Sequence, residues 1–203
     1  MFITNPDKLS PEFIFRGKLR IIVSPKCGSA SVYHTLKNTD VIAGFHTRSR
    51  DAYVPDYEKT IMVVRDPKQR IISCWKYFCK SDESLPILSL GMAAVGAKKD
   101  MSFADFVELV EANLYKEEHF IPQSYYCRNR VIYKYMLTEN LTEHWNTVAK
   151  AIMPTLPDLL YVNNDKNTAV SYDDLYTADI AAKVEEMYSD DFDLYEIAKA
   201  SFD

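Results

Sequence analysis

The order of apolar and polar residues alternates between two patterns along the chain. Short apolar runs rich in β-branched residues predict buried strands, at about residues 19–24, 41–45, 60–65 and 131–136. Segments with apolar residues at helical spacing predict helices, at about residues 29–38, 67–80, 102–114, 141–153, 173–188 and 191–200. Strands that alternate with helices are typical of parallel sheets with right-handed crossovers, so the pattern predicts an α/β fold.

The segments between these elements are polar or irregular. Residues 1–18 contain Pro6 and Pro11 and are expected to be irregular or to lie at a sheet edge. Residues 46–59 and 162–172 are predicted loops, and Ser81–Met101 is predicted to be a mobile insertion. With 203 residues, of which 47% are hydrophobic, the chain can bury one sizeable core, and a single domain over residues 1–203 is the simplest expectation.

The first strand leads into a loop suited to an anion. In the stretch LRIIVSPKCGSAS, residues 19–31, the apolar run breaks at Pro25 into a loop with Lys26 and Gly28, and Ser29 opens a helical pattern. A helix N-terminus carries unpaired N–H groups and a partial positive charge, so this loop can hold a phosphate. It is not a Walker A loop, because there the Lys directly follows the last Gly, whereas Lys26 precedes Gly28.

The third strand leads into a second unit of the same kind, TIMVVRDPKQRIISCW, residues 60–75. Asp66 and Pro67 predict the start of a helix directly after the strand. Arg65 would then lie at the carboxyl end of the strand, where open α/β sheets bind ligands. Ser73 lies two turns into the helix and shares a face with Arg70, which is expected at the surface rather than on a ligand.

These two stretches resemble the cofactor motifs of the sulfotransferases that use 3′-phosphoadenosine 5′-phosphosulfate (PAPS). PKCGSAS resembles their 5′-phosphosulfate loop, and Arg65 with Ser73 eight residues later resembles their 3′-phosphate site. The likeness is closest to the carbohydrate branch, which includes the heparan and chondroitin enzymes. HFIPQSYYC, residues 119–127, resembles that branch's His-x-x-Pro-Gln segment, and EEMYSDDFDLY, residues 185–195, its C-terminal tail. The resemblance implies a P-loop-like three-layer α/β/α fold with a central parallel sheet flanked by helices.

The resemblance also implies a reaction, the in-line transfer of a sulfuryl group from PAPS to a hydroxyl or amine, with a carbohydrate or a small metabolite as the expected acceptor. Lys26 would stabilise the charge that builds on the leaving 5′-phosphate. Arg65 and Ser73 would hold the 3′-phosphate, since a guanidinium fork suits phosphate oxygens. The reaction requires no metal. The residues expected to bind PAPS, or its product 3′-phosphoadenosine 5′-phosphate (PAP), are Lys26, Cys27, Gly28, Ser29, Ala30, Ser31, Arg65 and Ser73.

The general base is expected to be a histidine. His46 follows the predicted second strand, in the part of the chain from which the resembled branch often draws its base, and it is the first candidate. His119, in the His-x-x-Pro-Gln segment, is the second. His34 and His144 fall inside predicted helices, where a structural role is the default. A carboxylate from the 46–59 loop is a further alternative, with Asp51, Asp56 and Glu58 as candidates.

Charge and cysteine content narrow the possible partners. The net charge of −5 combines a basic stretch over residues 1–80, with 14 Lys and Arg against 7 Asp and Glu, and an acidic remainder. The basic stretch holds both motifs and would attract a polyanionic nucleotide, while the acidic remainder argues against nucleic acid as a partner.

The four cysteines lack disulfide or metal spacing, so free thiols are expected. Cys27 beside Lys26 is a candidate for a lowered pKa, although a small residue that fits the loop is the favoured interpretation.

No apolar run approaches the twenty residues that a membrane span needs, and residues 1–10 lack the pattern of a signal peptide. A soluble, cytoplasmic protein without a membrane partner, of bacterial or viral type, is expected.

Two other functions remain open from the sequence. The stretch IMVVRD has the form of a Walker B strand, so a P-loop kinase or NTPase with Asp66 on a metal is one of them, although the order of Lys26 and Gly28 argues against it. A nucleotide-binding module without turnover is the other, because a fold does not imply activity.

Overall fold

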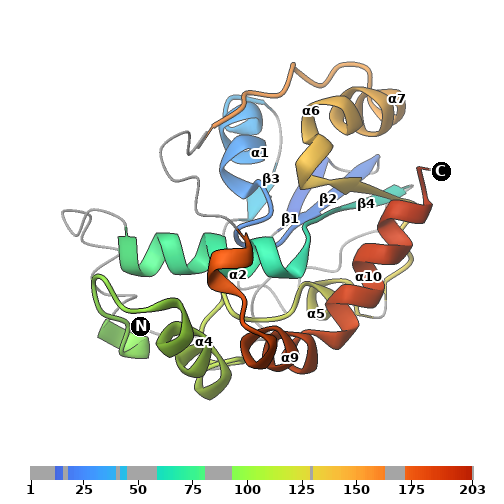
Figure 1. Cartoon of the computed structure of the whole chain (residues 1–203). Helices are drawn as coiled ribbons and strands as arrows, with labels where there is room; N and C mark the ends of the chain where they lie inside the picture. The colour runs from blue at the N-terminus through green and yellow to red at the C-terminus, as the bar shows by residue number, and fades with distance from the viewer. Residues whose placement is uncertain are drawn as a thin grey trace.

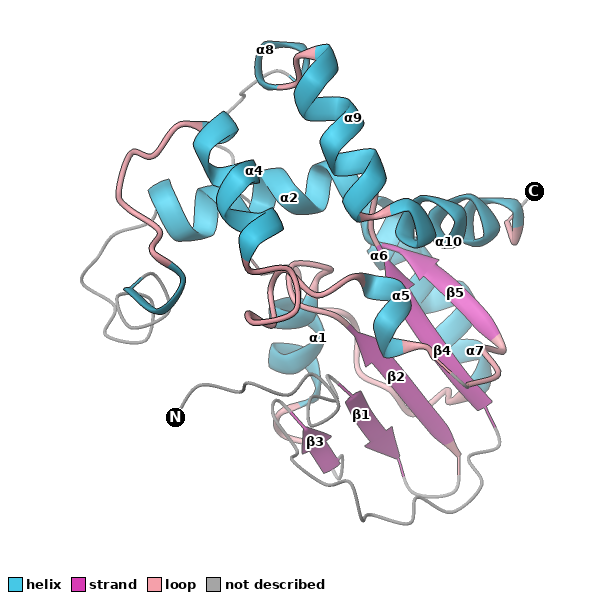
Figure 2. Ribbon diagram, turned by 90° about the horizontal axis from the view of Figure 1, so that it is seen from below, coloured by secondary structure: helices cyan, strands magenta, loops and turns pink. Residues whose placement is uncertain are grey.

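A five-stranded sheet forms the centre of the molecule, with the strands in the order β3-β1-β2-β4-β5 (Figure 2). The computed structural model describes residues 12–15, 18–39, 42–44, 59–80, 93–128, 130–162 and 172–202. The strands are β1 (Glu12–Phe15), β2 (Leu19–Val23), β3 (Ile42–Gly44), β4 (Lys59–Val64) and β5 (Lys134–Leu137).

The strands β2, β4 and β5 are parallel, as the alternating pattern predicted. Val23 is paired with Val63 across β2 and β4, and Val64 with Leu137 across β4 and β5. Their carboxyl ends therefore meet at one edge of the sheet, where the chain leaves β2 for α1 (Ser29–Leu36) and β4 for α2 (Pro67–Trp75). The α/β fold predicted from the sequence is confirmed.

The strand β1 was not predicted. Glu12–Phe15 lies between β3 and β2 and is antiparallel to both, so this part of the expected irregular or edge segment is an inner strand. A run of only four residues shows too little alternation to be recognised. Pairing on both sides supplies its backbone hydrogen bonds whatever its local pattern.

Helices cover both faces of the sheet and complete three layers (Figure 1). On one face Ile21 and Val63 pack with α1 and with the helical segment 141–152, which supplies Trp145. On the other face Ile22 and Met62 pack with α5 (Gln123–Tyr126) and α10 (Ser189–Ala200). This is the predicted three-layer α/β/α arrangement.

The segment 141–152 comprises α6 (Leu141–His144), a π-helical part (Trp145–Ala149) and α7 (Lys150–Ile152), and it follows a short 3₁₀ turn, Thr138–Asn140.

A further core, rich in aromatic residues, lies beyond the carboxyl ends of β2 and β4, where α2, α4 and α9 gather (Figure 2). The helix α2 continues as a π-helical segment, Lys76–Lys80, so that the predicted helix at 67–80 is continuous. Three further helices are α4 (Phe103–Ala112), α8 (Tyr172–Leu175) and α9 (Ala178–Met187). The rings of this core come from Trp75, Phe78, Phe103, Phe106, Phe120 and Tyr188.

None of the helices in the described parts of the chain is both long enough and apolar enough to cross a membrane. Most of the predicted insertion 81–101 and of the predicted loops 46–59 and 162–172 lies outside the described residues.

Candidate anion-binding and catalytic site

The loop between β2 and α1 has a left-handed backbone at two positions. Lys26 has φ 67° and Gly28 has φ 82°. A side chain at Gly28 is disfavoured for two reasons, the left-handed backbone and a Cβ that would lie 2.8 Å from Leu141 Cδ2. Lys26 adopts the same region without the freedom of a glycine, and residues held in this way cluster at functional sites. Within this loop the Cys27 N–H is already used, because it donates to Ser24 O at 3.1 Å, so the N–H groups left for an anion are those at the start of the following helix.

The N-terminus of α1 is open. No side chain caps it, and the first backbone bond of the helix runs from Val32 N to Gly28 O at 3.1 Å, so the N–H groups before Val32 have no intrahelical acceptor. The half-buried Ser29 hydroxyl makes no hydrogen bond within the described structure. The buried Ser31 hydroxyl is engaged, because it accepts from Val162 N at 3.0 Å and donates to Val162 O at 3.2 Å.

Cys27 is a packing residue in this loop. Its buried thiol accepts from Ser24 Oγ and donates to Gln123 Oε1, both at 3.0 Å. Burial raises the pKa of this thiol to about 11, although the positive charge of Arg70 acts on the pKa in the opposite direction. The favoured interpretation, a small residue that fits the loop, agrees with this geometry, and the alternative of a thiol with a lowered pKa was wrong.

Arg65 joins the two predicted motifs. It is the first residue after β4, and its Nη1 donates to the Lys26 carbonyl oxygen at 2.8 Å. The sequence placed both residues at the carboxyl ends of strands, and the contact follows because β2 and β4 are neighbours. Ser73 is half-buried in the second turn of α2, and its hydroxyl has no hydrogen-bond partner in the parts of the chain that are described.

Asp66 closes the N-terminus of α2. Its Oδ1 accepts from Lys68 N at 2.7 Å and from Gln69 N at 3.2 Å. Pro67 at the first helical position has no N–H to satisfy. This carboxylate acts as a helix cap, which is the ordinary use of an Asp at this position. Because the cap accounts for Asp66, the structure gives no support to the interpretation of this residue as a Walker B metal ligand.

Arg70 is buried and not at the surface, so the expectation for it was wrong. Only 1% of Arg70 is exposed. Its Nε donates to Pro25 O at 3.1 Å, and its Nη2 donates to His119 O at 3.0 Å and to Ile121 O at 2.8 Å. A helical pattern could not reveal this, since the three acceptors are carbonyls of distant segments. Arg70 holds the β2–α1 loop against the segment that carries His119.

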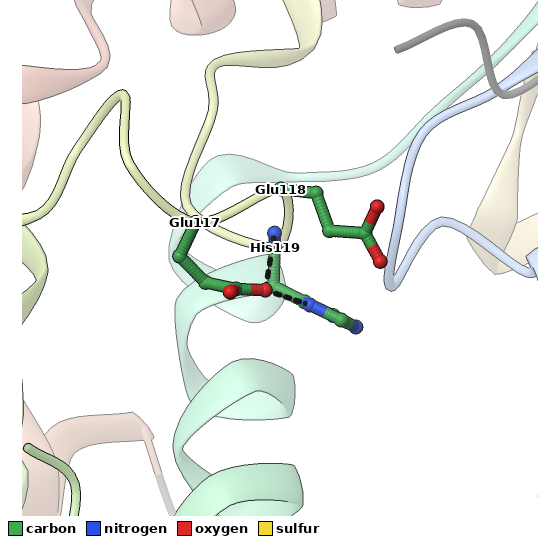
Figure 3. A group of neighbouring side chains, drawn as sticks. All are labelled: Glu117, Glu118 and His119. Carbon is green, nitrogen blue, oxygen red and sulfur yellow. Dashed lines mark hydrogen bonds and ion pairs between the residues drawn. The ribbon is translucent and has the colours of Figure 1, made fainter. Parts of the chain in front are cut away.

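His119 lies in a cluster with Lys26. The Tyr77 ring lies 4.2 Å from Lys26 Nζ and stacks on the His119 ring, with centroids 5.0 Å apart. The Nδ1 of His119 is 2.6 Å from Glu117 Oε1 (Figure 3), and 18% of the His119 side chain is exposed. A carboxylate can only accept, so Nδ1 carries the proton and a neutral His119 has its lone pair on Nε2. Burial and the charge of Glu117 raise the pKa of Tyr77, which therefore stays a neutral phenol.

The other histidines of the described residues have structural surroundings. His144 Nδ1 accepts from Leu137 N at 2.8 Å, its ring stacks on Phe202, and burial lowers its pKa. His34 lies in α1 beside Tyr33. The first candidate base, His46, and the carboxylates of its loop, Asp51, Asp56 and Glu58, lie outside the described residues.

Glu117, Glu118 and His119 could together hold a cation, since one ligand atom from each lies within 4.8 Å of the others (Figure 3). Such binding would break the bond between Glu117 and His119 Nδ1 or use the other nitrogen of the ring. The independence from metal expected from the sequence stays a prediction.

Sequence reasoning missed four residues of the site: Tyr77, Glu117, Gln123 and Asp191. Gln123 and Asp191 fall within the two segments noted for their family resemblance, which was the available signal. Their partners are 58 and 68 residues away in the chain, so no local pattern gave them a role.

The fold and the site define an α/β protein with an anion-binding loop and a neighbouring arginine at the carboxyl edge of a parallel sheet. A model of the Sulfotransferase family matches residues 29–198, and the chain belongs to this family. Arg65, Ser73, His119 and Gln123 lie within the match, while Lys26, Cys27 and Gly28 directly precede it. No curated protein and no solved structure matches the chain.

Proposed function

We propose that this sulfotransferase takes its sulfuryl group from PAPS and transfers it to a hydroxyl or amine, on a carbohydrate or a small metabolite. One observation carries the proposal beyond family membership: Arg65 Nη1 bonds to the Lys26 carbonyl, so the two cationic residues of the two motifs adjoin at one edge of the sheet. A nucleotide that carries one charged group at its 5′ end and another at its 3′ position could bind both residues at once.

The 5′ end of the donor would bind at the open N-terminus of α1. The N–H groups at the start of α1 that have no intrahelical acceptor and the Ser29 hydroxyl offer donors to a phosphate. The Lys26 ammonium would stabilise the charge on the oxygen that leaves sulfur. Ser31 would contribute its backbone N–H, because its hydroxyl is bonded to Val162.

The 3′-phosphate would bind Arg65, with Ser73 as a further donor. Arg65 is half-buried, and one hydrogen of its Nη1 is used by the Lys26 carbonyl, which leaves the other guanidinium donors, those of Nη2 among them, for phosphate oxygens. This phosphate is what distinguishes PAPS from ATP and from 5′-AMP.

His119 is the proposed base. Its Nε2 would take the proton of the acceptor hydroxyl or amine as that atom forms a bond to sulfur and the bond from sulfur to the phosphate oxygen breaks. Glu117 holds Nδ1 and stabilises the imidazolium that results. Proximity to Lys26 through Tyr77 favours His119 among the described histidines. His46 is the competing candidate.

Calorimetric titration with PAP tests the donor. We expect metal-free binding in EDTA that is tighter than binding of 5′-AMP or of ATP with Mg²⁺, and a loss of about 2–5 kcal/mol in Arg65→Ala. Equal affinity for the three nucleotides would rule out PAPS as the donor. Arg128→Ala is the matched control, since Arg128 is exposed and stacks on Tyr125.

Turnover tests the base and separates an enzyme from a binding module. PAPS is offered with a panel of sugars and small alcohols, and PAP release is followed. We expect His119→Ala to lower kcat about 100-fold or more with little change in KM for PAPS. His34→Ala, in α1, should have no such effect. If His46→Ala has the large effect and His119→Ala does not, His46 is the base.

A further inference from the structure

Gln123 lies where the two motifs and the His119 segment meet. We propose that Gln123 is a positioning residue, whose side-chain amide holds Arg65 and the Cys27 loop in the arrangement that binds the nucleotide donor. The inference rests on the proposed function, and it assigns to Gln123 the alignment of the two phosphate sites.

The Gln123 amide pairs with both backbone polar groups of Arg65. Its Oε1 accepts from Arg65 N at 2.9 Å, and its Nε2 donates to Arg65 O at 2.9 Å. The last pair between β2 and β4 is Val23 with Val63, and the last between β4 and β5 is Val64 with Leu137. Arg65 is therefore the first residue after β4 that is not paired with a neighbouring strand. The Gln123 amide supplies the two backbone hydrogen bonds that a neighbouring strand would otherwise supply.

The same amide reaches the anion loop. The Cys27 thiol donates to Gln123 Oε1 at 3.0 Å, next to Lys26, whose carbonyl accepts from the Arg65 guanidinium. Arg65 is thus fixed by its backbone to Gln123 and by its side chain to Lys26. One buried amide connects the end of β4 with the loop after β2.

Asp191 of α10 fixes the amide in turn. Its Oδ2 accepts from Gln123 N at 2.7 Å and lies 3.5 Å from Gln123 Nε2, and its Oδ1 accepts from Ser124 N at 2.8 Å. Both lone pairs of Gln123 Oε1 and both hydrogens of Nε2 are therefore used. The Arg70 guanidinium, 3.9 Å from Asp191, provides the opposite charge. Gln123 and Asp191 are both fully buried.

This arrangement requires an amide. Methionine has a similar length but neither donates nor accepts in the same way, so Arg65 N and O would lose their partners. Glutamate would keep the acceptor for Arg65 N and Cys27, lose the donor to Arg65 O, and place a second carboxylate beside Asp191. An effect on Arg65 is expected from either change, although neither removes a group that touches the nucleotide.

A double-mutant cycle tests the inference. PAP affinity is measured in the wild type, Gln123→Met, Arg65→Ala and the double variant. We expect Gln123→Met to weaken PAP binding about tenfold when Arg65 is present and less than about threefold when it is absent. An equal loss in both backgrounds, or no loss, would overturn the inference. Gln69→Met is the control, because Gln69 is the other glutamine of the chain and its side chain makes no hydrogen bond in the described structure.

Amide exchange of Arg65 N gives a readout that needs no nucleotide. Gln123→Met should speed exchange at Arg65 relative to Val64 by about tenfold, and Gln69→Met should not. Unchanged exchange at Arg65 would refute the inference even if PAP binds. If PAP shows no preference over 5′-AMP while Arg65 exchange does respond, the proposed donor is wrong and the positioning contact stands. If Gln123→Met fails to fold, Gln123→Leu replaces it, with the same expectations, because leucine also lacks both the acceptor and the donor.

Discussion

The helices α1 and α2 follow neighbouring parallel strands, yet their N-termini are built in opposite ways. The first has Gly28 at its N-cap position, has no side-chain cap, and follows Lys26 by three residues. The second has Asp66 at its N-cap position, where the carboxylate accepts from two N–H groups, and it begins with Pro67, which has no N–H. One helix end is therefore open to an anion from outside, and the other is closed by an anion of the chain itself.

Under the proposed function, the difference gives the two strand–loop–helix units different ways to bind a phosphate. The open unit offers backbone N–H groups and a lysine, whereas the closed unit offers the side chain that precedes its cap, Arg65. Because Arg65 Nη1 bonds to the Lys26 carbonyl, the closed unit also supports the loop of the open one. Four experiments test whether the two helix ends differ in this way.

The largest effect is expected from the lysine of the open unit. Lys26→Ala should lower turnover about 100-fold or more, since it removes the charge that stabilises the leaving phosphate. Lys68→Ala is the counterpart at the closed unit, where Lys68 pairs with Glu185, and it should change turnover less than about twofold. PAP release from PAPS measures both. Similar losses in the two variants would contradict the division into open and closed ends.

Alkaline pH should act on the open unit through Cys27. Because burial raises the pKa of this thiol from 9.0 to about 11, the unfolded chain releases the proton first as the pH rises. The stabilising contribution is complete below pH 9.0 and is lost toward pH 11, by about 3 kcal/mol in total. Urea unfolding between pH 8 and pH 11 should therefore show a shallower decline in Cys27→Ala than in the wild type. Parallel curves would mean that the thiol does not contribute.

Gly28→Ala should destabilise the fold by about 2 kcal/mol, since the new Cβ meets both a left-handed backbone and Leu141. Gly96→Ala is a matched control. Gly96 has φ 81°, but its nearest side-chain atom would lie 3.8 Å away, so it should cost only about 1 kcal/mol. Urea unfolding compares them, and an equal cost would show that the contact with Leu141 relaxes freely.

The smallest effect is expected at the cap of the closed unit. Asp66→Ala should lower the free energy of unfolding by about 1 kcal/mol, and Asp66→Asn by less, because asparagine also caps well. PAP affinity should change less than about twofold in either variant. A larger change in affinity than in stability would place Asp66 on the nucleotide and reopen the kinase interpretation.

The parts of the site that could be predicted were those that a short stretch of sequence specifies. Lys26 and Arg65 each follow an apolar run that ends in a turn, and two such runs in a parallel sheet end at the same edge. Asp66 and Pro67 together indicate a helix start from their chemistry alone.

The remaining parts depend on contacts between distant segments. Arg70 was placed at the surface because a polar residue in an amphipathic helix usually faces water, and three carbonyls that only the fold brings together reverse this. Gln123 and Asp191 are a similar case. The strand β1 was missed because its two partners, rather than its four residues, make it a strand.

Under the proposed function, the left-handed backbone at Lys26 sets stability against activity at a single position. Glycine would adopt φ 67° without steric cost, so Lys26→Gly relaxes the loop while it removes the ammonium group. A selection for heat resistance alone would favour that exchange and discard catalysis. Engineering of a hardier enzyme from this chain should therefore hold residue 26 constant and seek its gains elsewhere.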